Sequence, residues 1–364
     1  MMFLRRIRNV YYLLKERGLG FTYRHLRYWP LYMRHNKRIV DMFYKKVPMP
    51  YYIEIEISTY CDLRCIECEH TYWDEKPKLM SLDEYKKIID QIPSLTWVGF
   101  SGIGNNLLNK DFPKMLEYSK KKGQYTEIFD SFCKMTPEIL SKIFDAKIDK
   151  VYVSMDGTTK ETYEKIRVGS NYETVVENIK NFTREKKKRG TKLPLIAFHY
   201  IVNKINQHEM EDFVRLIARI CPKNEHIQFT NNLHEFEEIK DINTKITKEQ
   251  IKRVDKVGEE CKQTILWNLN TKADCNKVTM NNCIAWAMPY IFVTGHVIPC
   301  CAENEANRRE FQKKTSMGNV FETPFREIWY GKKFTALRKM LRSGQTPKVC
   351  EDCPVYQKCE NRKC

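Results

Sequence analysis

Three cysteines lie close together in the first third of the chain, in the run Cys61-Asp-Leu-Arg-Cys65-Ile-Glu-Cys68. Thiolates are soft ligands for iron, so three of them on one loop can hold three irons of a [4Fe–4S] cluster and leave the fourth iron open. The alternative is a zinc site, which usually has four ligands at paired spacings and would use His70 as the fourth. The spacing therefore predicts a metal centre on this loop, and it favours an iron–sulfur cluster over zinc.

A second group of cysteines lies near the C-terminus, among short apolar runs and Gly/Pro turns. It contains a Gly-x4-Cys element that ends at Cys300 and a Cys-x2-Cys-x5-Cys element that begins at Cys350. Because no secretion signal points to disulfides, a second iron–sulfur site or a structural zinc site accounts for these residues. The candidate ligands are Cys283, Cys300, Cys350, Cys353, Cys359 and Cys364.

Strand and helix patterns alternate between residues 51 and 230. The apolar runs typical of strands are separated by helical patterns, and Ser81-Leu-Asp-Glu84 is a capping box that begins the first helix. This alternation predicts a parallel α/β sheet, with the first cysteine loop directly after the first strand. The predicted strands are 51–57, 96–100, 125–129, 150–155, 195–202 and 226–230.

The two cysteine motifs and their order resemble those of the radical S-adenosylmethionine (SAM) superfamily with a C-terminal SPASM/twitch domain. The resemblance implies an α/β fold, a partial (β/α)6 TIM-like barrel followed by a small cysteine-rich domain. It also implies that the open iron binds SAM, whose reductive cleavage gives a 5′-deoxyadenosyl radical that abstracts hydrogen from an unactivated C–H bond. The implied parts are an N-terminal arm (1–50), a radical SAM core (51–232), a connecting segment (233–282) and the SPASM/twitch domain (283–364).

The resemblance further implies residues that bind SAM. A glycine-rich loop after the second strand contains Gly102, Gly104 and Asn105, and glycine permits the close approach of backbone to ligand. Asn105 replaces the glutamate usual in this motif, although an amide oxygen can still accept a hydrogen bond. Ser154 and Asp156 match the family's ribose and carboxylate contacts, and we expect Arg167 to reach the SAM carboxylate or to be a solvated residue at a helix end.

In the C-terminal part, the resemblance implies one or two auxiliary [4Fe–4S] clusters, supplied with electrons by a ferredoxin- or flavodoxin-type donor. One cluster would use Cys283, Cys300, Cys350 and Cys353, and Cys359 and Cys364 would complete a second. Active sites of barrel-like folds gather at the C-terminal ends of the strands. Two residues there, Cys133 and Tyr200, are candidates to return a hydrogen atom to a product radical; the alternative is that both line a pocket or the core.

The net charge of +17 is concentrated at the two ends of the chain. Residues 1–50 contain 12 basic and 2 acidic residues, and residues 305–364 contain 14 and 7, so the residues between them carry no net charge. No run of 18 apolar residues exists, which excludes a membrane-spanning helix. The basic N-terminal arm is rich in aromatic residues and is therefore a feature to be explained separately from the catalytic body.

Three interpretations of this arm are open: it binds an anionic membrane surface, it binds an acidic peptide or nucleic acid, or it packs along the barrel. Its Trp and Tyr content favours the membrane surface and disfavours nucleic acid. The leading hypothesis is therefore an enzyme acting on a lipid or membrane-associated substrate, by carbon–carbon bond formation or another modification. The alternatives are a peptide or protein maturase of the sulfatase-maturing or thioether-forming type, and a non-catalytic iron–sulfur electron carrier. Oxygen-labile clusters imply an anaerobic or reducing cytoplasm, at the inner membrane face if the arm binds lipid.

Overall fold

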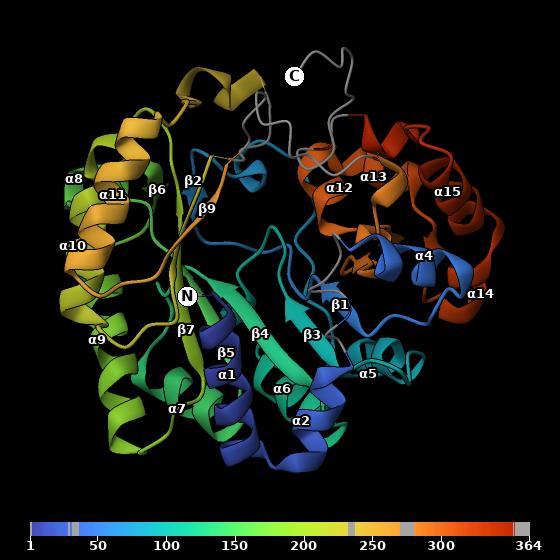
Figure 1. Ribbon diagram of the computed structural model, residues 1–364, viewed down its shortest axis with the longest axis horizontal. Helices are drawn as coiled ribbons and strands as arrows, with labels where there is room; N and C mark the ends of the chain where they lie inside the picture. The colour runs from blue at the N-terminus through green and yellow to red at the C-terminus, as the bar shows by residue number, and fades with distance from the viewer. Residues whose placement is uncertain are drawn as a thin grey trace.

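The computed structural model of the chain describes residues 2–27, 30, 36–231, 237–269, 280–351 and 353 (Figure 1). A ten-stranded sheet forms its centre, and a separate pair joins β2 to β6. The order of strands in the large sheet is β12-β11-β10-β1-β3-β4-β5-β7-β8-β9. The strands are β1 (Tyr52–Ile55), β2 (Arg64–Cys65), β3 (Trp97–Phe100), β4 (Tyr125–Asp130), β5 (Lys150–Ser154), β6 (Arg167–Val168), β7 (Leu195–Ile201), β8 (Ile227–Thr230), β9 (Ile265–Asn268), β10 (Tyr290–Ile291), β11 (His296–Ile298) and β12 (Gly318–Asn319).

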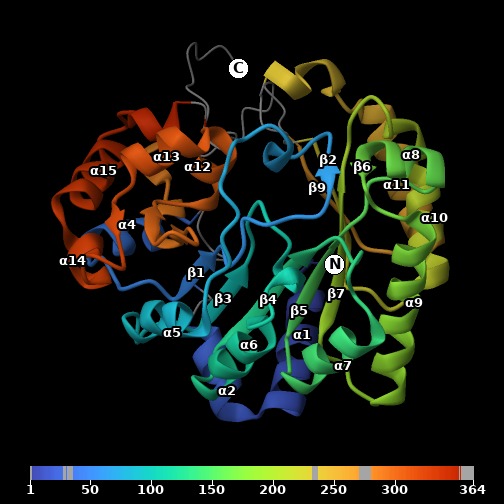
Figure 2. The same cartoon turned by 180° about the vertical axis from the view of Figure 1, so that it is seen from behind.

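Helices follow most of the strands and cover the sheet from outside (Figures 1 and 2). The α-helices are α1 (Met2–Arg17), α2 (Leu19–Leu26), α4 (Lys37–Lys45), α5 (Leu82–Asp90), α6 (Phe112–Lys121), α7 (Pro137–Asp145), α8 (Lys160–Ile166), α9 (Tyr172–Lys188), α10 (Met210–Ile220), α11 (Lys248–Glu260), α12 (Cys301–Ala306), α13 (Arg309–Thr315), α14 (Phe325–Tyr330) and α15 (Lys332–Arg342). The short 3-10 helices are η1 (Glu69–Thr71), η2 (Asn106–Leu108), η3 (Gln207–Glu209), η4 (Glu237–Ile242), η5 (Met280–Asn282), η6 (Ala285–Ala287) and η7 (Lys348–Cys350).

The parallel α/β sheet predicted from the sequence is confirmed, and it is larger than predicted. All six predicted strands are present and pair in parallel, in the order β1-β3-β4-β5-β7-β8. The predicted capping box is also present, since Ser81 and Glu84 each bond the other's backbone N–H at the start of α5. A seventh strand, β9, extends the sheet in parallel beside β8. Its four residues lie in the segment that the sequence patterns left as a connection.

The C-terminal part shares the sheet of the core. Strand β10 pairs in parallel with β1, and the antiparallel strands β11 and β12 follow it outward. Two backbone hydrogen bonds join the edge, from Glu54 N to Pro289 O (3.1 Å) and from Glu56 N to Ile291 O (2.9 Å). The part of the chain that carries the C-terminal cysteines therefore pairs with β1, the strand that leads into the first cysteine loop.

The described part of the N-terminal arm packs against the rest of the chain. Helices α1 and α2 lie at the N-terminal ends of the strands, where Leu13 is buried and His25 contacts the rings of Trp97 and Tyr125. Helix α4 lies beside the C-terminal part in Figure 1 and buries Phe43 against Trp286. Of the three interpretations of the arm, the structure agrees with packing along the barrel.

An apolar surface on α1 and α2 still faces outward. Tyr11, Leu19 and Tyr23 expose 57%, 75% and 69% of their surface. This surface is at the N-terminal edge of the sheet, whereas the cysteine loop leaves β1 at the opposite edge. The arm is therefore badly placed to deliver a lipid to the cysteine loop. None of the helices within the described residues is long and apolar enough to cross a membrane.

A buried carboxylate fixes the contact between the arm and the sheet. Asp149, just before β5, accepts hydrogen bonds from Arg17 Nε (3.0 Å), from Lys120 Nζ and from the backbone N–H of Thr126 (2.8 Å). Its side chain is fully buried. Burial lowers the pKa of Lys120 to about 8, and the charge of Asp149 opposes this shift. One carboxylate thus compensates two cations from different helices.

We predict that Asp149→Asn destabilises the protein by about 3 kcal/mol, because it leaves two buried cations without a carboxylate. Urea unfolding followed by tryptophan fluorescence measures this loss. Glu138→Gln is the matched control: it breaks an exposed pair with Lys142 and should cost less than about 0.5 kcal/mol. Equal midpoints for the two variants would contradict the structural role of Asp149.

Candidate active site

The first cysteine loop runs from the end of β1 and is held on a second short sheet. Cys65 lies in β2, opposite Arg167 of β6, and the backbone N–H of Ile66 bonds to Ile166 O (2.9 Å). The hydroxyl of Thr71 donates to Cys65 O (2.7 Å) and fixes the loop after its last cysteine. Backbone pairing therefore sets the position of all three cysteines relative to the core.

The three thiols of this loop lie in one low-dielectric environment. Burial raises the pKa of Cys61 and Cys68, and it raises the pKa of Cys65 to about 12. Cys61 and Cys65 also raise the pKa of Cys68, since each adds repulsion to its thiolate form. Such thiols become stable thiolates when a metal takes the place of the protons. The donor set thus fits the predicted cluster.

His70 does not complete a zinc site in this arrangement. Its Nε2 atom lies 3.1 Å from Thr59 O, and its Nδ1 atom lies 3.5 Å from Nη1 of Arg64. Both ring nitrogens therefore already face protein atoms. In the part of the chain that the structure describes, no group of three or more His, Cys, Asp and Glu side chains is arranged around a single metal ion. This geometry disfavours the zinc alternative.

The glycine-rich loop after β3 packs directly on the start of the cysteine loop. Gly102 has φ +145°, and a Cβ there would lie 2.6 Å from Cγ of Glu56. A Cβ at Gly104 would lie 2.3 Å from the backbone oxygen of Ser58. Glycine is required at both positions, since a side chain at either would collide with the segment that follows β1.

Asn105 ties the glycine-rich loop to the cysteine loop. Its N–H donates to Tyr60 O (2.8 Å), and its Nδ2 lies 3.5 Å from Oδ1 of Asp62. Its side-chain oxygen accepts from the N–H of Leu107 (2.9 Å) and caps η2. The residue that replaces the family's glutamate thus has a local structural role, and its contact with SAM stays a prediction, as do those of Gly102 and Gly104.

A buried charged network lies beneath the cysteine loop. Asp156 is fully buried and accepts from Arg167 Nε (2.6 Å) and from the N–H of Ile201 (2.7 Å). Glu67 accepts from Asn203 Nδ2 (3.1 Å), and its Oε1 is buried 3.9 Å from Arg167 Nη2. Burial and the nearby Asp156 raise the pKa of Glu67. The sequence motifs indicated Asp156 and Arg167 singly, but no pattern in the chain indicated that they meet each other and Glu67.

The contacts of Arg167 in this network differ from those expected from the sequence. The guanidinium of Arg167 is paired with Asp156 within the core. This pair holds β6 under the cysteine loop. A solvated residue at a helix end does not describe this buried side chain, and its contact with the SAM carboxylate stays a prediction. Ser154 is half-buried at the end of β5, opposite His199 of β7, and its contact with SAM stays a prediction.

The two candidate hydrogen donors occupy different environments. Cys133 is half-buried after β4, and its Sγ lies 3.0 Å from Oγ of Ser170, close behind β6. Tyr200 is fully buried on the helix side of β7, where its hydroxyl donates to Asn206 O (2.9 Å) and its ring contacts Phe213. This environment favours the alternative that Tyr200 belongs to the core, and its role as a hydrogen donor stays a prediction.

Four C-terminal cysteines lie together. Burial raises the pKa of Cys300 most, and the thiols of Cys301, Cys353, Cys350 and Cys283 all add to that rise. Cys301 differs from its neighbour Cys300, because its thiol hydrogen-bonds to the carboxylate of Glu54. This donor set fits the single auxiliary cluster predicted from the sequence. Cys359 and Cys364, which would complete a second cluster, lie outside the described residues.

Comparisons with known proteins agree with this arrangement. The family model of the radical SAM superfamily matches residues 55–217, and that of the SPASM iron–sulfur cluster-binding domain matches residues 283–354. A tungsten-containing aldehyde ferredoxin oxidoreductase cofactor-modifying protein from Pyrococcus furiosus is 27% identical over 85% of this chain and 88% of its own length. The PqqA peptide cyclase of Bradyrhizobium diazoefficiens is 21% identical over 84% of this chain and 79% of its own.

Solved structures show the same fold. Streptococcus suis SuiB bound to S-adenosylmethionine matches with a TM-score of 0.66 at 15% identity, over 97% of this chain and 87% of SuiB. SuiB bound to its precursor peptide SuiA matches with a TM-score of 0.65, also at 15% identity, over 89% of this chain and 74% of that one. At this identity the likeness concerns the fold alone.

The Cys300 and Cys301 thiols have different contacts, and this difference gives a test of the auxiliary site. We predict that Cys300→Ala lowers the iron content of reconstituted protein by about four atoms per chain, the content of one cluster. Cys301→Ala should leave it unchanged, because that thiol faces Glu54. Iron and sulfide analysis measures both variants. Loss of iron from Cys301→Ala alone would show that the ligand assignment is reversed.

Proposed function

Because the chain belongs to the radical SAM superfamily and carries a SPASM domain, we propose that it modifies a peptide by abstracting hydrogen from an unactivated C–H bond. The supporting observation is that the similarity to a peptide cyclase extends through both domains. Mycofactocin maturases, such as that of Mycolicibacterium smegmatis, are also similar, at 23% identity over 50% of this chain. The substrate class is inferred from these relatives and from the geometry of the arm.

The residues of this chain divide the work of such a reaction. When bound, the iron–sulfur clusters supply the electron for cleaving SAM, which yields the radical that removes hydrogen from the substrate. Cys61, Cys65 and Cys68 would hold the SAM-binding cluster, and the glycine-rich loop would meet SAM with its backbone. Cys283, Cys300, Cys350 and Cys353 would hold the auxiliary cluster. A ferredoxin- or flavodoxin-type donor stays part of the proposal.

Cys133 is the better placed of the two candidate hydrogen donors. It follows β4 at the C-terminal edge of the sheet, and the adjacent Lys134 forms an ion pair with Asp62 of the cysteine loop (2.9 Å). This proximity to the cysteine loop supports a position near SAM for the Cys133 thiol. We therefore retain Cys133 in the proposal as a donor to the product radical.

The lipid hypothesis, although it led the sequence interpretation, is not the one proposed. Helices α1 and α2 pack at the N-terminal ends of the strands, so their exposed apolar residues are at the edge of the sheet opposite the cysteine loop. Helix α4 packs against Trp286 of the C-terminal part. The relative from Bradyrhizobium diazoefficiens is named for a peptide substrate, which favours a peptide over a lipid. The non-catalytic carrier is likewise set aside, because the family is enzymatic. A cytoplasmic location stays a prediction.

A deuterium-transfer assay tests the substrate class without knowledge of the substrate. Cells of the source organism grown in deuterated medium give a small-peptide fraction and a total lipid fraction. We predict that reconstituted protein with SAM and dithionite forms deuterium-enriched 5′-deoxyadenosine with the peptide fraction, measured by mass spectrometry. Enrichment should disappear when that fraction is first digested with protease.

The controls separate the chemistry from the substrate. The triple variant Cys61→Ala, Cys65→Ala, Cys68→Ala should form no 5′-deoxyadenosine with any fraction. Unlabelled 5′-deoxyadenosine from wild type without added fraction would report SAM cleavage alone. Enrichment with the lipid fraction and none with peptide would refute the peptide proposal while leaving the radical SAM activity intact.

A further inference from the structure

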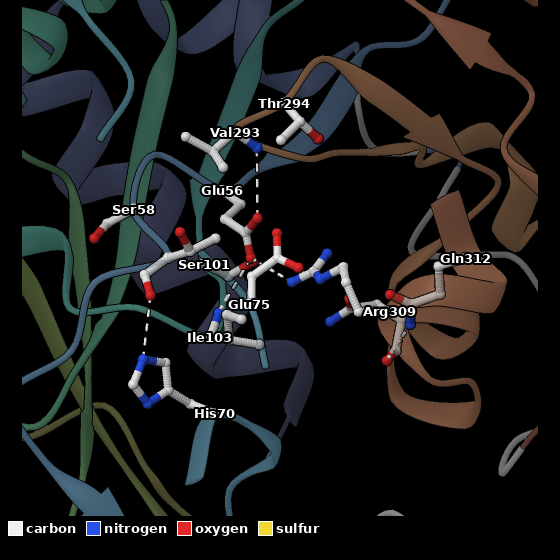
Figure 3. Close-up of polar contacts among 12 residues, drawn as sticks. Glu56, Ser58, His70, Glu75, Ser101, Ile103, Val293, Thr294, Arg309 and Gln312 are labelled. Atoms are coloured by element: carbon white, nitrogen blue, oxygen red, sulfur yellow. Dashed lines mark hydrogen bonds and ion pairs between the residues drawn. The ribbon is translucent and has the colours of Figure 1, made fainter. Parts of the chain in front are cut away.

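A buried ion pair joins the core to the auxiliary domain directly beside the glycine-rich loop (Figure 3). Glu56, the residue after β1, is 1% exposed, and Arg309 at the start of α13 is 3% exposed. Nη2 of Arg309 lies 2.7 Å from Oε2 of Glu56. The two residues are 253 positions apart and belong to the two parts matched by different family models.

The carboxylate of Glu56 holds backbone from both parts. Its Oε2 accepts from the N–H of Ile103 in the glycine-rich loop (3.3 Å), and its Oε1 accepts from the N–H of Val293 in the β10–β11 turn (3.4 Å). Gly102 packs on the same side chain, and no Cβ fits between them. Figure 3 shows the carboxylate between these groups, with Arg309 approaching from the auxiliary side. The shape of the glycine-rich loop therefore depends on where Glu56 points.

Arg309 is held by few other groups. Its guanidinium lies over the ring of Phe292, 3.8 Å from the centroid, and 5.7 Å from the ring centroid of Trp73. Among the described residues, its Nε and Nη1 atoms are buried without a hydrogen-bond partner. The contact with Glu56 is thus its principal polar interaction, and aromatic rings from both parts keep it in place.

The pair is interdependent because of its burial. A buried carboxylate is stable only when it is paired and hydrogen-bonded, and the same holds for a buried guanidinium. Removing Arg309 would leave Glu56 as an unpaired charge, which would protonate or turn toward water. Either change would release the N–H of Ile103 and the close packing on Gly102.

We propose that Arg309 is a positioning residue for SAM binding: through Glu56 it fixes the backbone of Gly102 and Ile103, which SAM meets. The auxiliary domain would thereby contribute to SAM affinity without touching SAM. This inference rests on the radical SAM activity and on the predicted role of the loop. It does not depend on the substrate being a peptide.

SAM affinity of the reconstituted full chain tests this proposal. Arg309→Met and Glu56→Gln should each weaken SAM binding about tenfold and raise KM for SAM in 5′-deoxyadenosine formation. The kcat at saturating SAM should stay within about twofold of wild type. Arg309→Lys should restore most of the affinity, and the double variant should be no weaker than either single variant, because the two residues act as one unit.

A neighbouring ion pair supplies the matched control. Lys313 and Glu75 also join the auxiliary domain to the core (2.7 Å), but neither is hydrogen-bonded to the glycine-rich loop in the described contacts. The charge of Glu75 acts on both Glu56 and Arg309, so the control variant keeps Glu75 and removes only Lys313. Lys313→Met should leave SAM affinity within about twofold of wild type. If Lys313→Met weakened SAM binding as much as Arg309→Met, the effect would belong to the interface as a whole and the proposal would be wrong.

Amide hydrogen exchange supplies a readout independent of activity. In reconstituted Arg309→Met, the peptide that covers residues 101–106 should exchange about tenfold faster than in wild type, because the bond from Ile103 to Glu56 is lost. Lys313→Met and Arg309→Lys should exchange nearly as wild type does. Unchanged exchange and unchanged SAM affinity in Arg309→Met, with only a lower unfolding temperature, would overturn the proposal and leave the pair as an interface contact.

Discussion

The pairing of β1 on both of its edges is the constraint on which the rest of the structure depends. On one edge β1 pairs with β3, which leads into the glycine-rich loop, and on the other it pairs with β10 of the auxiliary domain. Its own C-terminal end leads into the first cysteine loop. Because parallel strands end at the same edge of a sheet, three segments far apart in the sequence arrive side by side. One short strand, β1, thus sets the positions of both the predicted SAM site and the auxiliary cysteines.

Buried ion pairs then fix the positions of loops and short strands that backbone pairing alone does not determine. Below the cysteine loop, Asp156 and Arg167 hold β6 against β2, and Glu56 and Arg309 hold the glycine-rich loop against the auxiliary domain. Both residues of each pair are nearly inaccessible to water. Each charge therefore depends on its partner to compensate for lost hydration. Replacing such pairs by apolar residues is often neutral for stability. Their value here is therefore better explained by the geometry they impose on loops that must accept a cofactor.

The sequence could predict the parts of this structure that have local signals. Cysteine spacing predicted both donor sets, and alternating apolar runs predicted the six core strands together with the capped start of α5. It could not predict β10, since a two-residue strand has no periodicity and its partner lies more than 200 positions away. The packing of the arm was one of three interpretations that the sequence left open, because basic residues such as Arg17 look alike whether they face lipid, water or a buried Asp149. The sequence also left open whether Tyr200 lines a site or the core, because neighbouring residues of a strand point to opposite faces of the sheet.

The distribution of charge follows from the same arrangement. The arm and the auxiliary domain carry the net positive charge, and part of it is paired inside the protein with Asp149 and Glu56. An exposed ion pair between Asp41 and Arg342 joins the arm to the auxiliary domain. A basic end of a chain is thus no direct sign of an anionic partner when its cations are used to attach that end to the core. The same reasoning applies to Arg309: a basic residue in the auxiliary domain serves the core because the sheet is shared. A rigid connection of this kind lets the auxiliary domain influence SAM binding through backbone position, with no need for a moving domain or a direct contact.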